Sequence, residues 1–298
     1  MAAHPHRGNG PQGGGFSQEQ SGGLKLPTFF LAGAPKAGTT SLYHYLDQHP
    51  EIYMSPMKEP HFFSSEIREQ NFGPRLKRMV ARHEAELRQF LDGPMREKRF
   101  GGIVSEWDDY LRLFANASGE PQLGEASVCY LWSPSAPIRI AQQIPQAKIL
   151  VMLRDPADRE FSEYRQCLGS GVVRCSFRDY IRRGLKHRSQ PFSIYHPSLE
   201  LGLYGEQIRR YLGLFRENVW VGFHDDFRRR PREVYRAICR FLGVSADFAP
   251  NMRRRYLQGT AAAEPMEARD RRYLIDFYRE DIALLATLLK SDLDAWLK

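Results

Sequence analysis

A glycine-rich loop between a short apolar run and an amphipathic segment is the feature that most limits how this chain can fold. The stretch reads "FFLAGAPKAGTTSLYHYL" and covers residues 29–46. "TFFLAG" is typical of a short buried strand, and "TTSLYHYLDQHP" carries apolar residues at helical spacing until Pro50. A strand, a glycine loop and a helix in this order place backbone N–H groups and a helix N-terminus around an anion. The stretch therefore predicts an anion-binding α/β fold, although a simple strand-to-helix turn remains the alternative.

The loop differs from the common ATP-binding pattern in the position of its lysine. Gly33 and Gly38 keep the spacing of G-x-x-x-x-G-K-[ST], but Thr39 stands where that pattern has lysine. The lysine of this loop is Lys36, which lies between the two glycines. This displacement argues against an ordinary ATPase or kinase and disfavours magnesium.

A second buried strand is predicted at "AKILVMLR", residues 147–154, and a helix follows it. Arg154 stands where the strand ends, and Ser162 comes eight residues later. In α/β folds this edge of the sheet faces the ligand crevice, and a guanidinium can bind phosphate through two parallel hydrogen bonds. Alternatively, Arg154 pairs with Asp155 or Asp158. Two such motifs on two strands favour a ligand with two separate anionic groups.

The rest of the chain alternates in the same way. We expect a third strand at 218–227, and helices at 135–144, 176–186, 201–216, 231–242 and 272–290. Strands that alternate with helices predict a central parallel sheet flanked by helices on both faces. We expect one domain at 27–298 and a disordered Gly-rich tail at 1–26. The charged segment 66–99 is expected to form either a surface helix or a helical lid over the acceptor site.

Composition limits the partners and the compartment. The net charge of +8 and the pI near 9.3 favour an anionic partner. The four cysteines form no C-x-x-C pair, which argues against metal sites and thioredoxin-like chemistry and indicates ordinary thiols in a reducing compartment. The sequence offers no recognised nucleic-acid module and no N-terminal apolar run. We expect a soluble, cytoplasmic protein that does not insert stably into membranes or bind nucleic acid; the oligomeric state stays open.

Four motifs resemble one family. "PKAGTTSLYHYL", "KEPHFF" (58–63), "GEASVCYLW" (124–132) and "LRDPADREFSEY" resemble motifs of the sulfotransferase superfamily that uses 3′-phosphoadenosine 5′-phosphosulfate (PAPS). They are most similar to the heparan-sulfate-like and bacterial branches. The order and spacing agree from Pro27 to about residue 245.

The resemblance implies a single P-loop-like α/β domain and an enzyme. Such an enzyme moves the sulfonate group of PAPS in line to a hydroxyl or amine and releases 3′-phosphoadenosine 5′-phosphate (PAP), without a required metal. The acceptor would be a carbohydrate, a lipid, a polyketide or another small molecule. By position, the residues that would bind the nucleotide are Lys36, Ala37, Gly38, Thr39 and Thr40 at the 5′-phosphosulfate and Arg154 and Ser162 at the 3′-phosphate. The basic loop 251–260 is a further candidate for closing over the 3′-phosphate.

The resemblance also implies the catalytic residues. Glu59 would be the general base, His61 would lie nearby, and Lys36 would stabilise charge on the leaving oxygen. Glu59 and His61 would point to the same side if their segment is extended. Ala126 follows Glu125 where some relatives have lysine, which puts a second cation at the sulfonate in doubt. The alternatives are a P-loop nucleotide kinase-like phosphotransferase and a non-catalytic protein that binds PAPS or another anion.

Overall fold

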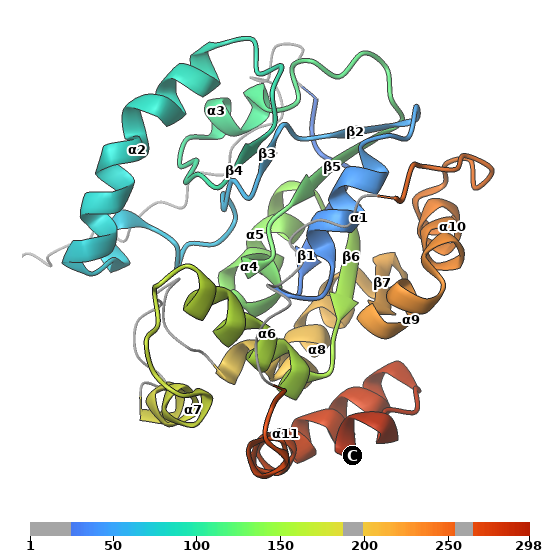
Figure 1. Cartoon of the computed structure of the whole chain (residues 1–298). Coiled ribbons are helices and arrows are strands. Elements are labelled where there is room, and N and C mark those ends of the chain that lie inside the picture. Colours follow the sequence, from blue (N-terminus) through green and yellow to red (C-terminus); the bar gives the residue numbers. More distant parts are fainter. Residues whose placement is uncertain (1–24, 187–198, 254–264) are drawn as a thin grey trace, which may run out of the picture.

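The computed structural model describes residues 25–186, 199–253 and 265–298 (Figure 1). Most of the predicted tail, and residues 254–260 of the basic loop, lie outside the described residues. Leu26 already packs against the core. In the described part of the chain, no helix combines the length and the apolar character that crossing a membrane requires.

A parallel sheet of five strands forms the centre of the described structure (Figure 1). Its strands, in sheet order, are β2 (Ile52–Met54), β5 (Gln122–Ala126), β1 (Phe29–Gly33), β6 (Lys148–Leu153) and β7 (Val219–Phe223). Every neighbouring pair in this sheet is parallel. A smaller parallel pair joins β3 (Met57–Lys58) to β4 (Arg99–Phe100). The predicted α/β class with a central parallel sheet is therefore confirmed.

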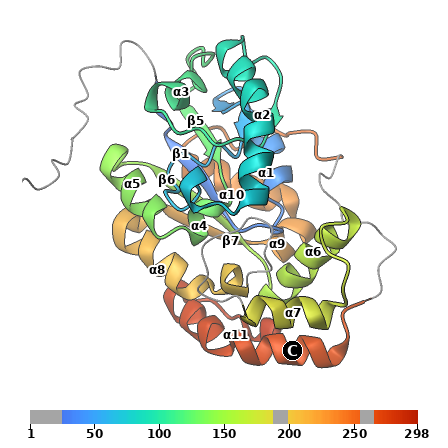
Figure 2. The same cartoon turned by 90° about the vertical axis from the view of Figure 1, so that its left-hand side faces the viewer.

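Helices lie on both faces of this sheet, as the two views show (Figures 1 and 2). The helices that pack towards one face are α1 (Thr39–Leu46), α9 (His224–Arg229) and α10 (Pro231–Leu242). The other face is covered by α4 (Cys129–Trp132), α5 (Ser135–Gln143) and α8 (Tyr204–Phe215), with α11 (Ala268–Leu289) packed on α8. The remaining α-helices are α2 (Pro74–Asp92), α3 (Trp107–Arg112), α6 (Pro156–Gly169) and α7 (Phe177–Lys186). Short 3-10 helices span Glu69–Asn71, Leu199–Gly202, Arg216–Asn218 and Asp294–Leu297.

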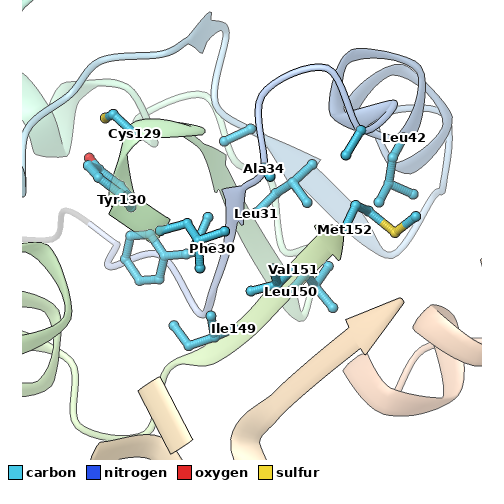
Figure 3. Packing of buried hydrophobic residues seen from close by; sticks show 14 of the residues in the cluster. Phe30, Leu31, Ala34, Leu42, Cys129, Tyr130, Ile149, Leu150, Val151 and Met152 are labelled. Carbon is cyan, nitrogen blue, oxygen red and sulfur yellow. The ribbon is translucent and has the colours of Figure 1, made fainter. Parts of the chain in front are cut away.

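The core is built around β1, whose five residues are all buried. Because successive side chains of a strand point to opposite faces, β1 supplies both layers. Phe30 packs edge-on against Tyr130 of α4, with ring centroids 6.2 Å apart, whereas Leu31 lies on the side of Leu42 in α1 (Figure 3). An apolar run of this kind is expected for a strand that is covered on both faces.

The third predicted strand is shorter than expected. We predicted residues 218–227, but β7 ends at Phe223 and α9 begins at His224. Asp225 and Asp226 lie in the first turn of α9, where their charge is favourable at the N-terminal end of the helix dipole. The prediction was wrong there because it extended the strand into this charged first turn.

The charged segment 66–99 contains α2, which begins with Pro74 in its first turn and ends at Asp92. Met79, Leu87 and Phe90 pack against the core, whereas the side chain of His83 is mostly exposed. Part of this helix is therefore buried against the core, and a lid function for it stays a prediction.

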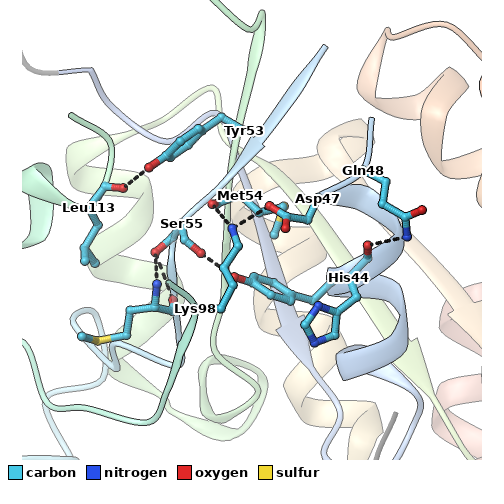
Figure 4. Close-up of polar contacts among 10 residues, drawn as sticks. His44, Asp47, Gln48, Tyr53, Met54, Ser55, Lys98 and Leu113 are labelled. Atoms are coloured by element: carbon cyan, nitrogen blue, oxygen red, sulfur yellow. Dashed lines mark hydrogen bonds and ion pairs between the residues drawn. The ribbon is translucent and has the colours of Figure 1, made fainter. Parts of the chain in front are cut away.

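Polar contacts fix the turn before the predicted base (Figure 4). The hydroxyl of Tyr43 in α1 donates to the carbonyl oxygen of Ser55 at 2.6 Å. Ser55 Oγ accepts from the backbone N–H of Met57 at 3.2 Å and donates to its carbonyl oxygen at 3.0 Å. Lys98 adds an ion pair to Asp47 at 2.6 Å. These contacts hold the segment that begins at residue 57 against the helix that follows the glycine loop.

Candidate active site

A cavity of about 620 Å³ lies at the edge of the sheet where the parallel strands end. Residues that follow four different strands line it, namely Lys36 after β1, Val128 after β5, Arg154 after β6 and His224 after β7. Ligands of open α/β sheets bind outside the carboxyl ends of the strands, and this volume suits a small-molecule ligand.

Nearly all the predicted site residues meet in this cavity. Those that line it are Lys36, Gly38, Thr39, Thr40, Glu59, His61, Arg154 and Ser162. Ala37 is not among the lining residues, because its side chain is fully buried and its N–H donates to the carbonyl oxygen of Ala34 at 3.3 Å. No described side chain of α2 lines the cavity.

The glycine loop leaves the N-terminus of α1 open towards the cavity. Lys36 has φ of 65° and Gly38 has φ of 85°, so the loop turns through the left-handed region. A Cβ on Gly38 would also lie 3.3 Å from the ring of Phe227. The first turn of α1 has neither a side-chain cap nor an acidic residue. Its orphan N–H groups and positive dipole end therefore suit an anionic ligand.

Lys36 projects from this loop towards α6. Its ammonium group donates to Oε1 of Gln166 on α6, and its carbonyl oxygen accepts from the Arg154 guanidinium at 3.2 Å. Burial lowers the pKa of Lys36, Glu163 opposes that change, and the positive charge of Arg154 adds to it. The two cations are thus held together at one side of the cavity.

The carboxylates beside Arg154 have another partner. Asp155 caps α6, with Oδ1 accepting from the N–H groups of Ala157 and Asp158 at 2.8 and 3.2 Å. Arg271 of α11 forms ion pairs with Asp155 at 2.7 Å and with Asp158 at 2.8 Å. The alternative in which Arg154 pairs with these carboxylates is therefore not what the structure shows, and Arg154 lines the cavity instead.

Glu59 faces the cavity with a side chain that is 23% exposed. Its Oε1 pairs with the Lys58 ammonium at 3.1 Å, and its Oε2 accepts from the N–H of Val128 at 3.3 Å. Burial raises the pKa of Glu59, but Lys58, His61 and these hydrogen bonds outweigh burial, so the pKa lies below its ordinary value. Glu59 is therefore ionised near neutral pH and can accept a proton.

His61 lines the same cavity, although its segment is not extended as we assumed. Its φ is 58°, and the chain turns at this residue. The backbone N–H donates to Ser127 Oγ at 3.3 Å, and the ring Nδ1 lies 3.0 Å from Sγ of Cys129. Burial lowers the pKa of His61, Glu59 opposes this, and Lys58 adds to it, so the imidazole is neutral at neutral pH.

Several lining residues were not predicted from the sequence. They include Lys58, Cys129, Gln166 and His224. His224 directly follows β7, but the predicted strand ran to residue 227 and so placed His224 inside it. Lys58 and Cys129 lie inside the motifs "KEPHFF" and "GEASVCYLW" but were given no role, and the place of Gln166 depends on how α6 packs against the glycine loop. Within the described ranges, no group of three or more His, Cys, Asp or Glu side chains is arranged to hold a metal ion.

A buried carboxylate supports the floor of this site. Glu125, at the end of β5, is fully buried and accepts from Ser127 Oγ at 2.6 Å, from Tyr130 OH at 2.9 Å and from Tyr110 OH at 3.1 Å. Burial raises the pKa of Glu125 to about 7, although the three hydrogen bonds act in the opposite direction. Ser127 in turn accepts from the N–H of His61, which links this network to the segment that carries Glu59 and His61.

Glu125 should make the protein less stable as the pH rises. Its pKa in the folded protein, about 7, exceeds its ordinary value of 4.5, so the folded state binds more protons between these values. Its contribution is present below about pH 4.5 and is lost as the pH rises through about 7, a change of about 3 kcal/mol. Urea unfolding from pH 4.5 to 8 should show this loss in the wild type. The difference between wild type and Glu125→Gln should change with pH; parallel curves would contradict the raised pKa.

Comparisons with known proteins point in one direction. The family model described as "Sulfotransferase family" matches residues 27–248. The crystal structure of a sulfotransferase from Alicyclobacillus acidocaldarius is similar, with 35% sequence identity and a TM-score of 0.75 over 92% of this chain and 100% of that chain. The sulfotransferase domain from the curacin biosynthetic pathway has a TM-score of 0.52 over 90% of this chain and 99% of its own, and at 19% identity it shows likeness of fold alone.

Curated relatives include larger proteins. The mouse (Mus musculus) bifunctional heparan sulfate N-deacetylase/N-sulfotransferase 4 is 28% identical over 92% of this chain and 31% of its own length. Human (Homo sapiens) carbohydrate sulfotransferase 15 is 25% identical over 91% of this chain and 54% of its own length. The chain thus spans about a third and about half of these relatives.

Proposed function

This chain belongs to the sulfotransferase family, and we propose that it transfers the sulfonate group of PAPS to a hydroxyl or amine of an acceptor, with release of PAP. The acceptor is a carbohydrate, a lipid, a polyketide or another small molecule. The observation that carries this proposal is one cavity that combines an anion loop with a lysine, a strand-end arginine and a carboxylate with a lowered pKa.

The cavity offers two separate places for anionic groups, as PAPS requires. At one, the uncapped N-terminus of α1 and the Lys36 ammonium group would hold the 5′-phosphosulfate. At the other, Arg154 and Ser162 would hold the 3′-phosphate. The Ser162 hydroxyl has no hydrogen-bond partner among the described residues, so it is available to a ligand.

The proposed reaction is a single in-line displacement. The acceptor atom forms a bond to sulfur while the bond from sulfur to the 5′-phosphate oxygen breaks. Glu59 takes the proton that the acceptor loses, and Lys36 offsets the negative charge that grows on the leaving oxygen. No step calls for a metal ion.

The acceptor side begins at Glu59. Ile67, Cys129 and Trp132 also line the cavity and add apolar surface to it. Because the curated relatives are named for heparan sulfate and carbohydrate, a carbohydrate is the first acceptor to test.

The function is tested by incubating the protein with ³⁵S-labelled PAPS and a panel of acceptors. The panel contains de-N-sulfated heparan and chondroitin oligosaccharides, a fatty alcohol and a phenol. We expect label on at least one acceptor and the formation of PAP. Tight PAP binding without transfer to any member, and without hydrolysis of PAPS, would instead favour a non-catalytic anion-binding protein.

The 3′-phosphate should decide which nucleotide binds. A charge-assisted hydrogen bond contributes about 1.5–3 kcal/mol, so PAP should bind at least about tenfold more tightly than AMP. Isothermal titration calorimetry measures both affinities. Arg154→Ala should remove most of this preference, whereas Arg182→Ala, an exposed residue of α7, should keep it. Equal affinities for PAP and AMP in the wild type would refute the assignment of the 3′-phosphate site.

A further inference from the structure

A row of three polar side chains runs from the protein interior to the cavity at His61. Ser64 Oγ lies 3.3 Å from Sγ of Cys129, and the same sulfur lies 3.0 Å from Nδ1 of His61. Ser64 is fully buried, and Cys129, which lines the cavity at the start of α4, is 8% exposed. The sulfur atom therefore joins the imidazole to a hydroxyl that solvent does not reach.

The protons in this row can be arranged in three ways. In the first, Ser64 Oγ–H donates to the sulfur and the thiol S–H donates to His61 Nδ1. In the second, His61 Nδ1–H donates to the sulfur, the thiol donates to Ser64 Oγ, and the Ser64 proton needs a third partner. In the third, the sulfur accepts from both His61 Nδ1–H and the Ser64 hydroxyl, and the thiol proton has no acceptor in the row. Within the part of the chain that the structure describes, the Ser64 hydroxyl has Cys129 as its side-chain partner and no other acceptor.

The first arrangement is therefore favoured. It gives every buried proton in the row an acceptor, whereas the second leaves a buried hydroxyl proton unsatisfied and the third leaves the thiol proton unsatisfied. In this arrangement the thiol S–H donates to Nδ1, so the ring proton of the neutral imidazole is on Nε2.

The two central groups are neutral at neutral pH, as this arrangement requires. Burial raises the pKa of the Cys129 thiol well above its ordinary value, and the charge of Glu59 acts in the same direction. Burial lowers the pKa of His61. A thiolate facing an imidazolium, the reactive form of a cysteine–histidine pair, is therefore disfavoured.

We infer that Cys129 is a positioning residue that fixes His61 in the tautomer with its proton on Nε2, the nitrogen that remains for the cavity. In this tautomer Nε2 donates a hydrogen bond and cannot accept a proton. His61 then orients the sulfonate or the acceptor oxygen, and the proton of the acceptor goes to Glu59. The tautomer follows from the contacts alone, whereas its consequence for transfer rests on the proposed function.

The tautomer is measured directly by NMR on the full chain labelled with ¹⁵N-histidine, first free and then with PAP. The spectrum of His61→Gln identifies the signals that belong to His61. We expect the proton of His61 on Nε2 in the wild type and in Cys129→Ser, whose hydroxyl can still donate to Nδ1. In Cys129→Ala a mixture of tautomers should appear. A wild-type His61 with its proton on Nδ1 would overturn the inference, whether or not the protein transfers sulfonate.

Kinetics provide the second measurement. The readouts are hydrolysis of PAPS to PAP and transfer of sulfonate to the acceptor panel described above. Cys129→Ala should lower kcat about fivefold to tenfold, the effect of one neutral hydrogen bond, with little change in the KM for PAPS. Cys129→Ser should recover most of this loss. Cys239→Ala removes another buried thiol, in α10 and outside the cavity, and controls for lost packing.

The two failures can be told apart. If Cys129→Ser loses as much activity as Cys129→Ala while both keep the wild-type melting temperature, the hydrogen bond to His61 has no role and the inference is wrong. If the wild type neither transfers nor hydrolyses sulfonate, the proposed function fails, and the NMR result still decides the tautomer. If Cys129→Ala does not fold, the wild-type tautomer and Cys129→Ser decide the outcome.

Discussion

Replacing Glu59 with glutamine is expected to lower sulfonate transfer at least about a hundredfold, because a positioned general base contributes about 10²–10⁴ in rate. An alcohol keeps its proton at neutral pH, so the attacking oxygen needs a group that removes it. Glu59 is ionised there, because the charge of Lys58 and the hydrogen bonds from Lys58 and Val128 keep its pKa low despite burial. Glutamine keeps the size of the side chain but cannot take the proton. Single-turnover transfer from labelled PAPS measures the loss, and calorimetry should show unchanged affinity for PAP.

The comparison with His61 makes this test sharper. His61→Ala should lose less activity than Glu59→Gln, because we assign it to orienting the acceptor or the sulfonate. Glu97→Gln, a substitution of an exposed carboxylate outside the cavity, should be neutral. An inactive His61→Ala beside an active Glu59→Gln would reverse the two roles. If Glu59→Gln and His61→Ala both transfer sulfonate at the wild-type rate, the base lies elsewhere and this segment has only a structural role.

Replacing Lys36 with alanine should lower the transfer rate by about 10²–10³, the usual effect of losing one group that stabilises charge in the transition state. The effect on nucleotide binding should be smaller, because Arg154 and the open N-terminus of α1 would still hold the ligand. Rapid-quench assays at saturating PAPS separate the rate of the chemical step from affinity. EDTA should leave the wild-type rate unchanged, because in the proposed mechanism the Lys36 ammonium group, and not a metal ion, stabilises the charge on the leaving oxygen.

Lys186→Ala, an exposed residue at the end of α7, is the matched control for Lys36. A near-normal rate in Lys36→Ala would transfer its role to another cation, and Lys58 is the candidate because it also lines the cavity. Complete inactivation of the wild type by EDTA would contradict the metal-free mechanism.

The sequence predicted the fold best where the hydrophobic pattern of a segment matches its burial in the folded protein. β1 is apolar throughout, and β6 is apolar after Lys148, because both faces of the sheet are covered. Short strands behaved differently. β2 has three residues and β3 has two, and strands this short show no recognisable hydrophobic periodicity in the sequence. The end of β7 was placed too late because the prediction carried the strand pattern into the first turn of α9.

The site was predictable where one short segment carries several of its groups. The glycine loop and the strand-end arginine are local motifs, and the resemblance supplied Glu59 and His61. Gln166 and Cys129 were missed because only packing brings α6 to Lys36 and α4 to His61. The spacing of the cysteines did not reveal the role inferred for Cys129. Spacing identifies candidate metal sites and disulfides, but not a thiol that donates a hydrogen bond to an imidazole.

The ion pairs of Arg271 bear on how this protein can be dissected. The stretch that matches the family model stops at residue 248, yet Arg271 lies beyond it on α11 and neutralises Asp155 and Asp158, the two carboxylates next to Arg154. A fragment trimmed to the matched stretch would leave two neighbouring negative charges without their counterion, close to the proposed 3′-phosphate site at Arg154. The smallest unit for engineering a new acceptor preference therefore includes the last long helix, even though none of its residues lines the cavity.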